Sequence, residues 1–287
     1  MGSILSNNTI LKNNFSAVVI AYNSEQTIKR CLDSISNQDI TPDELILVDD
    51  GSLDKTVLYS DGYNCNIIKN KVNKGRGYSR NLAVQHSKNE LILFCDSSNI
   101  IPPNFFSKAR IHFENKDIGA VFGIIKNDSC LNDVFSRWRA KYLFHEKTEI
   151  KNYCHETETL MTYACMVRRS SILSVGNFDK RLPKCEDMEL GRRLINGGHK
   201  ILSDPSLSTY SIRLETMTSL CVRFNRWHSN DIESFKFFSG IINTFKACFC
   251  IYARNDITER DFPSLLISIS LPFWFTIIAI FARKKYN

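Results

Sequence analysis

The stretch from Phe15 to Asn37, FSAVVIAYNSEQTIKRCLDSISN, sets the pattern on which the chain is built. Its first eight residues, Phe15 to Tyr22, form an uninterrupted apolar run of strand length. Asn23 and Ser24 then supply side chains that can cap a helix over 25–37. The apolar residues Ile28, Cys31, Leu32 and Ile35 recur at helical spacing. The stretch therefore predicts a buried strand, a tight turn and a helix.

The same unit recurs along the chain. The other expected elements are strands over 44–48, 65–69, 91–95, 119–125 and 160–167, helices over 77–87, 104–114 and 132–146, and a helix starting near Leu53. Short buried strands that alternate with helices predict an α/β fold with a mostly parallel sheet covered on both faces. Ligands of such sheets bind beyond the carboxyl ends of the strands.

Composition narrows the class of partner. The chain has 287 residues, a formal charge of +7 and a hydrophobic fraction of 43%, which suffices for a packed core. Because the basic residues are dispersed, they fit an anionic small ligand or an anionic membrane surface better than nucleic acid. Ten cysteines without a C-x-x-C pair, and no apolar leader, favour a reduced intracellular compartment and argue against zinc.

Polar residues follow the first two expected strands. Tyr22 and Asn23 end the first strand, and Asp49 and Asp50 end the second, where Gly51 permits a positive φ angle in the turn. Carboxylates at this edge can bind a base N–H or ribose hydroxyls. The alternative is a polar turn that ends a strand and caps the next helix.

A basic, glycine-containing loop precedes the helix over 77–87. The stretch 73–81, NKGRGYSRN, combines two glycines with Lys74, Arg76 and Arg80. Backbone N–H groups at a helix start, together with fixed positive charge, are suited to phosphate. The alternative is a basic surface turn.

Five motifs in this order resemble glycosyltransferase family 2, whose members have the GT-A fold. They are AYN, DDGS, N-K-G-x-x-x-S-R-N, a strand ending in Asp96, and the pair GNFD (176–179) and CEDMELGRRL (185–194). The resemblance covers about residues 13–230. It implies transfer of a sugar, with inversion, from a nucleoside diphosphate sugar to a hydroxyl acceptor, and uridine is the favoured base.

The resemblance also implies roles for single residues. Tyr22, with Asp49 or Asp50, would contact the nucleoside, and Asn23 lies beside them. Arg76 or Arg80, with Lys74, would lie near the diphosphate. Asp96 would lie by the ribose and diphosphate.

The acids of the last motif are the catalytic candidates. Asp187 would take the proton of the acceptor hydroxyl, as such a displacement requires. A helix that starts after Cys185 places Glu186 and Asp187 at its N-terminus, where its dipole favours negative charge. The alternative is that both are ordinary first-turn acids of a surface helix.

The metal site of the family is altered here. Relatives usually have Asp-x-Asp at this strand end, but this chain has Asp96-Ser97-Ser98, and a serine such as Ser98 is a poor ligand for magnesium or manganese. A histidine common in relatives is missing, and Arg213 lies near its place. Two hypotheses stay open: Arg213 and the basic loop stabilise the leaving group without metal, or Asp96 and the substrate phosphates hold a Mg²⁺ or Mn²⁺ ion.

Arg223, Arg226 and Trp227 partly match the Q-x-x-R-W signature of processive family members, with Arg223 in the place of the glutamine. On that resemblance they belong to the acceptor or product side. The alternative is a helix that buries Phe224 and Trp227 and exposes its arginines.

The C-terminal part predicts membrane association. Residues 262–282 carry no charge, and as a helix they would be about 30 Å long, which matches a hydrocarbon core. A single span would place the basic residues 283–285 on the wrong side for an enzyme that uses cytoplasmic nucleotide sugars. Residues 235–253 would therefore be a hairpin arm or, preferably, an interfacial helix, with the tail re-entrant or monotopic. A buried core helix or a dimer face is the alternative.

We therefore predict an N-terminal extension (1–12), a GT-A domain (13–230) and membrane-associated helices (231–287) at the cytoplasmic side of a membrane. A lipid-linked acceptor fits this location. Two other functions are kept as alternatives: a non-catalytic nucleotide-sugar-binding protein and a nucleotidyltransferase, although the turn 21–24, AYNS, lacks the glycine-rich loop and lysine typical of the latter. The sugar, the acceptor, the linkage and the oligomeric state are left open.

Overall fold

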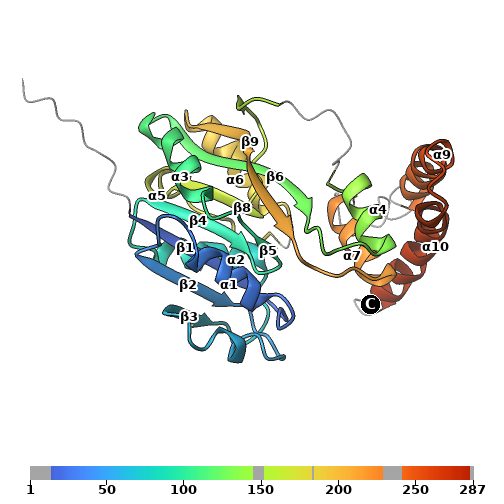
Figure 1. Cartoon of the computed structure of the whole chain (residues 1–287), viewed down its shortest axis with the longest axis horizontal. Helices are drawn as coiled ribbons and strands as arrows, with labels where there is room; N and C mark the ends of the chain where they lie inside the picture. The colour runs from blue at the N-terminus through green and yellow to red at the C-terminus, as the bar shows by residue number, and fades with distance from the viewer. Residues whose placement is uncertain (1–13, 145–151, 183, 229–240, 285–287) are drawn as a thin grey trace, which may run out of the picture. The chain divides into compact units, whose positions relative to one another are not determined.

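The computed structural model describes residues 14–144, 152–182, 184–228 and 241–284 (Figure 1). The chain divides into two compact units. The first, here called the sheet unit, comprises residues 1–124 and 151–211, and the second, the helical unit, comprises 125–150 and 212–287. The two predicted domain boundaries, after residues 12 and 230, fall outside the described residues.

The sheet unit is built on one sheet. Its described strands follow the order β3-β2-β1-β4-β8-β6-β9-β5, and β7 pairs with β9. Their bounds are β1 Phe15–Ala21, β2 Glu44–Asp49, β3 Cys65–Lys69, β4 Leu91–Asp96, β5 Asn99–Ile100, β6 Ile118–Asn127, β7 His155–Glu156, β8 Ala164–Arg168 and β9 Lys200–Ser211. The predicted strands all occur, although β8 starts four residues later than expected.

The sheet is mixed, and the half that the first motifs build is parallel. Strands β3, β2, β1 and β4 are parallel neighbours, but β8 pairs antiparallel with both β4 and β6. The prediction of a mostly parallel sheet assumed that the strand–helix repeat of the first hundred residues continues along the whole chain. The antiparallel strand β8 departs from that repeat. Because β8 returns beside β4 in the opposite direction, its start lies at the carboxyl end of β4.

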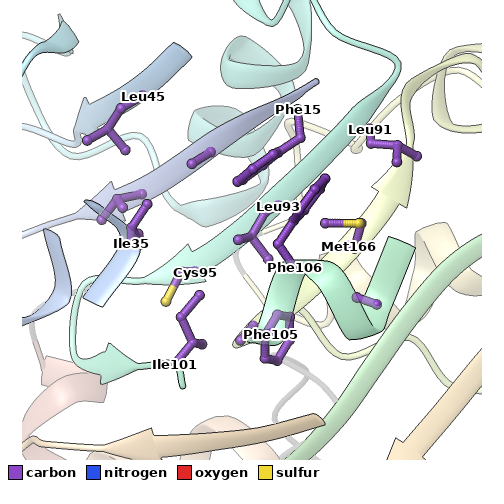
Figure 2. Packing of buried hydrophobic residues seen from close by; sticks show 14 of the residues in the cluster. Phe15, Ile35, Leu45, Leu91, Leu93, Cys95, Ile101, Phe105, Phe106 and Met166 are labelled. Atoms are coloured by element: carbon purple, nitrogen blue, oxygen red, sulfur yellow. The ribbon is translucent and has the colours of Figure 1, made fainter. Parts of the chain in front are cut away.

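Helices cover both faces of this sheet, as predicted. One face carries α1 (Ile28–Ser36), α3 (Phe105–Arg110) and the short helix η2 (Ile111–Glu114), and the other carries α2 (Arg76–His86), α5 (Arg169–Ser174) and α6 (Glu186–Asn196). Figure 2 shows the first core, where Phe15 of β1 stacks on Phe106 of α3 with ring centroids 3.7 Å apart. The strands alternate their apolar side chains between the two cores, which fixes the register of each pair.

The expected helix near Leu53 is wrong. Only a short helix, η1 (Leu58–Ser60), forms in this part of the chain. Side chains from the turn after β1 bind the backbone there instead: Asn23 Oδ1 accepts from the Leu53 N–H, and Glu25 accepts from the Lys55 N–H. These bonds offer the backbone an alternative to a helical ladder.

Among the described residues, the helical unit includes α4 (Val134–Tyr142), α7 (Met217–His228), the π-helix η3 (Ala247–Tyr252), α9 (Ala253–Thr258) and α10 (Phe262–Lys284). Trp138 is fully buried at its centre, and its Nε1 donates to Ser268. The buried carboxylate of Asp256 accepts from Lys141, Tyr142 and Ser268. Since all these groups are paired, the network links α4, α9 and α10 without an unsatisfied buried charge.

Helix α10 is apolar on more than one face. Its residues Ile267, Leu271 and Phe275 are buried in the core of the helical unit, whereas Leu266 and Phe273 are exposed. Within the described part of the chain, no helix is both long enough and apolar enough to cross a membrane. The predicted interfacial segment 235–253 starts among residues outside the description, so membrane association stays a prediction.

Candidate active site

Two of the predicted acids lie at the carboxyl edge of the parallel strands. Asp49 ends β2 and pairs in register with Ala21 of β1, and Asp96 ends β4 and pairs with Ile20 of the same strand. Both acids therefore flank β1, one strand to each side. Asp96 follows the alternation that places its side chain on the face covered by α2 and α6.

Arg80 of α2 joins the third motif to the fourth and fifth. Its side chain is almost fully buried, and it binds Asp96 at 2.8 Å and Glu186 of α6 through its two terminal nitrogens. Burial alone would lower the pKa of Arg80, but Asp96, Glu186 and Asp187 outweigh it and raise the pKa above its ordinary value. The three elements are thus held together by one buried cation.

Asp187 lies beside this cluster in the first turn of α6. Its Oδ2 accepts from the Thr162 hydroxyl at 3.1 Å, and its Oδ1 accepts from the Met188 N–H at 2.9 Å. Cys185, directly before α6, has the left-handed φ of 59°, which is strained for a residue with a Cβ. Asp187 is half-buried, whereas Glu186 is buried and paired with Arg80, so Asp187 has the carboxylate that an acceptor can approach.

Thr162 is a site residue that sequence reasoning missed. It lies just before β8, in a region that matches no motif. Its neighbour Tyr163 accepts the Asp96 N–H with its carbonyl at 3.0 Å, which ties the start of β8 to the end of β4. Only this antiparallel return, which the sequence pattern does not indicate, brings Thr162 to Asp187.

A close approach of α2 to α6 needs glycine at position 77. A Cβ there would lie 2.8 Å from the Asp179 carbonyl oxygen and 3.2 Å from the Glu186 Cβ. Both distances are shorter than ordinary van der Waals contacts. The second glycine of the basic loop therefore serves helix packing beside the site.

Asp50 has a structural role in the basic loop. Its carboxylate accepts from the backbone N–H groups of Lys74 and Gly75, each at 2.9 Å, and from Asn70 Nδ2 at 2.7 Å. Two of the backbone donors expected to bind phosphate are therefore already engaged. The loop keeps the exposed side chains of Lys74 and Arg76 for an anionic ligand.

The remaining nucleoside-side residues surround the turn after β1. Tyr22 is 47% exposed, and Asn23 adopts a positive φ of 47° while its side chain accepts from the Leu53 N–H. Asp49 is buried and accepts from the Ser52 N–H at 3.2 Å. Of these, Tyr22 presents the most open surface for stacking a base.

The residues at the end of β4 are a poor fit for a divalent ion. One oxygen of Asp96 faces Arg80, and the other lies 3.9 Å from Arg76. Ser98, in the place of the second acid, is half-buried, and its side chain forms no hydrogen bond to another described residue. A cation would meet one carboxylate and two guanidinium groups, and positive neighbours oppose its binding.

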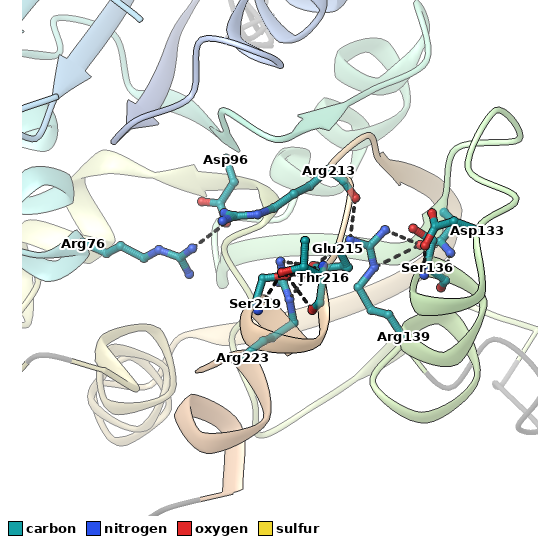
Figure 3. Close-up of polar contacts among 11 residues, drawn as sticks. Arg76, Asp96, Asp133, Ser136, Arg139, Arg213, Glu215, Thr216, Ser219 and Arg223 are labelled. Atoms are coloured by element: carbon teal, nitrogen blue, oxygen red, sulfur yellow. Dashed lines mark hydrogen bonds and ion pairs between the residues drawn. The ribbon is translucent and has the colours of Figure 1, made fainter. Parts of the chain in front are cut away.

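The predicted C-terminal candidates belong to the helical unit. Figure 3 shows Arg139 and Arg223 directed at Glu215, which is fully buried and binds them at 2.8 and 2.7 Å. The Arg213 carbonyl accepts from Arg139 at 2.9 Å. Arg223 thus forms a buried ion pair, and the role of Arg213 stays a prediction. The side chains of Arg226 and Trp227 lie outside the described residues.

The family model described as glycosyl transferase family 2 matches residues 16–176, which is more than half of the chain. The chain belongs to this family. One relative is the O-antigen chain rhamnosyltransferase RfbN of Salmonella typhimurium, with 28% identity over 193 residues, 64% of this chain and 62% of the relative. The present chain thus spans less than two thirds of that relative's length. The poly(ribitol-phosphate) β-N-acetylglucosaminyltransferase TarS of Staphylococcus aureus is 36% identical over 94 residues, 30% of this chain and 16% of TarS.

Solved structures confirm the GT-A fold. Residues 1–349 of S. aureus TarS in complex with UDP-GlcNAc superpose with a TM-score of 0.57 at 18% identity, and the match covers 92% of this chain and 81% of that one. The mannosyltransferase PcManGT of Pyrobaculum calidifontis, in complex with GDP-Man and Mn²⁺, gives a TM-score of 0.56 at 15% identity, with coverage of 90% and 73%. At these identities the likeness concerns the fold alone.

Proposed function

We propose that this family member is an inverting glycosyltransferase that moves a sugar from a nucleoside diphosphate sugar, with uridine as the favoured base, to a hydroxyl acceptor. The observation that carries the proposal is the convergence of Asp96, Arg80 and Glu186, from β4, α2 and α6, beside Asp187. The third, fourth and fifth motifs contribute these residues, and the first two motifs end the neighbouring strands β1 and β2 at the same edge of the sheet.

In the proposed reaction, Asp187 takes the proton of the acceptor hydroxyl as the oxygen attacks the anomeric carbon of the donor. The bond from that carbon to the diphosphate oxygen breaks, and the nucleoside diphosphate leaves with the bonding electrons. A base needs a carboxylate oxygen within hydrogen-bond reach of the acceptor, and the leaving group needs positive charge. Lys74 and Arg76 supply exposed positive charge at the start of α2.

A donor screen tests this proposal directly. Ligands that bind only the folded protein raise its melting temperature. We expect one class of nucleoside diphosphate sugar to raise it more than the corresponding monophosphate, because Lys74 and Arg76 lie where a diphosphate is proposed. Thermal-shift measurements across uridine, guanosine and thymidine donors give the base. The absence of any shift with all of these donors would contradict the proposal.

We further propose that turnover does not need a divalent ion. The support is the pairing of Asp96 with Arg80 and Arg76 and the serine at position 98. We expect at least about half of the donor turnover to persist in excess chelator, because guanidinium groups already supply the positive charge. Activity that disappears in chelator and returns only with manganese or magnesium would overturn this part of the proposal and leave the transferase assignment intact.

The helical unit is proposed to hold the protein at the cytoplasmic surface of an anionic membrane, where a lipid-linked acceptor would be available. Phe273 of α10 contacts Phe245 and Phe249 edge-on, with ring centroids 5.2 and 6.3 Å away. Phe249, Leu266 and Phe273 are exposed at 41%, 71% and 52%. The exposed basic side chains Lys246, Arg254 and Arg260 are also in this unit. Apolar and basic residues together are typical of helices that lie in a membrane interface.

Co-sedimentation with lipid vesicles tests the location. We expect the chain to bind vesicles that contain anionic lipid, and the variant with both Leu266→Glu and Phe273→Glu to bind at least about tenfold more weakly, since each lost apolar contact is worth about 2 kcal/mol. Leu58→Glu, at a similarly exposed position in the sheet unit, is the matched control. Equal binding by the double variant and the wild type would refute the proposed surface.

A further inference from the structure

A second group of metal-binding side chains lies in the sheet unit, apart from the residues assigned to the sugar donor. The side chains of His112, Cys154 and Asp204 place one ligand atom each within 4.8 Å of one another. They come from η2, from the residue directly before β7, and from β9. In the strand order, β8 and β6 separate β9 from β4, which carries Asp96.

Hydrogen bonds orient the carboxylate in this group. Asp204 is 8% exposed, its Oδ1 accepts from the Ser206 N–H at 2.9 Å, and its Oδ2 lies 2.8 Å from His112 Nε2. The Ser206 N–H fixes one oxygen of the carboxylate, as the outer contacts of metal ligands do, and a metal ion would take the place of the proton between the other oxygen and His112 Nε2.

We propose that His112, Cys154 and Asp204 bind a zinc ion. A thiolate, an imidazole and a carboxylate are the side chains that bind Zn²⁺ in proteins, and the thiolate disfavours magnesium and manganese. At zinc bond lengths of about 2.0–2.3 Å, neighbouring ligand atoms of a tetrahedral site lie about 3.3–3.8 Å apart. His112 Nε2 and Asp204 Oδ2 lie 2.8 Å apart, and all three ligand atoms lie within 4.8 Å of one another, so shifts of roughly an ångström would close the site around the ion. A water molecule would complete the coordination.

The proposed ion has a structural role. Strand β7 has only two residues, His155 and Glu156, and its described pairing is with Ser203 and Leu202 of β9. Cys154 precedes this short strand, and Asp204 follows its partner residues. Zinc would therefore fasten the strand to β9 and to η2. Because metal binding to a folded site adds to the free energy of unfolding, zinc should stabilise the protein.

This site escaped the sequence analysis for a physical reason. The absence of C-x-x-C pairs argues only against zinc sites whose ligands lie close together in the sequence. Here the ligands lie 42 and 50 residues apart by their numbers, at positions 112, 154 and 204. The fold alone brings them together.

The test is zinc binding by the purified, metal-free full-length chain, measured by competition with a chromophoric chelator. We expect one zinc ion to bind saturably, and the single variants Cys154→Ser, His112→Gln and Asp204→Asn each to weaken binding by about tenfold or more. The matched controls are Cys130→Ser, another exposed thiol, and Asp96→Asn, at the donor side. Both controls should bind zinc like the wild type.

A second readout reports the thiolate ligand itself. Cobalt bound to a thiolate gives a sulfur-to-metal charge-transfer band, which we expect in the wild type and in Cys130→Ser but not in Cys154→Ser. The proposal is overturned if zinc does not bind saturably, if Cys154→Ser binds it like the wild type, or if only Asp96→Asn loses it. The last outcome would place the ion at the donor side. None of these results depends on whether the chain transfers sugar.

Discussion

Replacing Asp187 with asparagine is expected to lower kcat for sugar transfer by about 100- to 10,000-fold, the range that a general base contributes. Asparagine keeps the size of the side chain and can still accept from the Thr162 hydroxyl, which now bonds to Asp187 Oδ2 at 3.1 Å. It cannot take a proton from the acceptor. The effect should therefore appear in the chemical step and leave the donor's binding constant within about twofold of the wild type.

The measurement is single-turnover transfer with a radiolabelled donor, combined with donor binding by calorimetry. Glu189→Gln is the matched control, because Glu189 is an acid in the same first turn of α6 that pairs with Arg193 on the surface. We expect its transfer rate to stay close to that of the wild type. An Asp187→Asn variant with unimpaired transfer would show that another group takes the proton. If the wild type binds the donor but shows no detectable transfer, the result would favour the alternative of a non-catalytic nucleotide-sugar-binding protein.

Thr162→Val probes the same carboxylate indirectly. Valine has nearly the shape of threonine but donates no hydrogen bond to Asp187. If Thr162 only positions Asp187, the loss in kcat should be smaller than that of Asp187→Asn, and the two losses should not add in the double variant. Additive losses would mean that the two side chains act separately.

The parallel half of the sheet and its strand-end acids could be predicted from sequence because they rest on local pattern. An apolar run of the length of Phe15–Ala21, followed by a turn and a helical pattern, predicts a buried strand, and Asp49 and Asp96 end two further strands of this kind, one on each side of β1. The period of the pattern also separates the side chains between two cores.

The antiparallel half could not be predicted in the same way, because it depends on contacts between distant segments. Nothing in the sequence around β8 indicates that it pairs with β4 rather than continuing the parallel repeat. The same holds for Asp50: its position after β2 predicts a ligand, but its use as an acceptor for the Lys74 and Gly75 N–H groups requires the loop to fold over it. A strand-end acid is equally suited to both tasks, and only the fold distinguishes them.

The largest effect on stability is expected from Arg80→Met. Methionine fills a similar volume but removes the one buried cation that binds Asp96 and Glu186. Removing one partner of a buried ion pair leaves charge without compensation and costs about 3–5 kcal/mol of unfolding free energy. Its pairing runs through the two terminal nitrogens, since its buried Nε has no hydrogen-bond partner among the described residues.

Urea unfolding followed by circular dichroism measures this loss, with Arg76→Met as the matched control. Arg76 is 44% exposed and lies 3.9 Å from Asp96, so its removal should cost about 1 kcal/mol or less. The decisive comparison is the double variant Arg80→Met with Glu186→Gln. If the penalty of Arg80→Met comes from uncompensated charge, removing one of the two carboxylates should recover part of the stability, which simple loss of packing would not allow. A double variant less stable than Arg80→Met would show that Arg80 acts through its packing, and the electrostatic link between the third and fifth motifs would then fail.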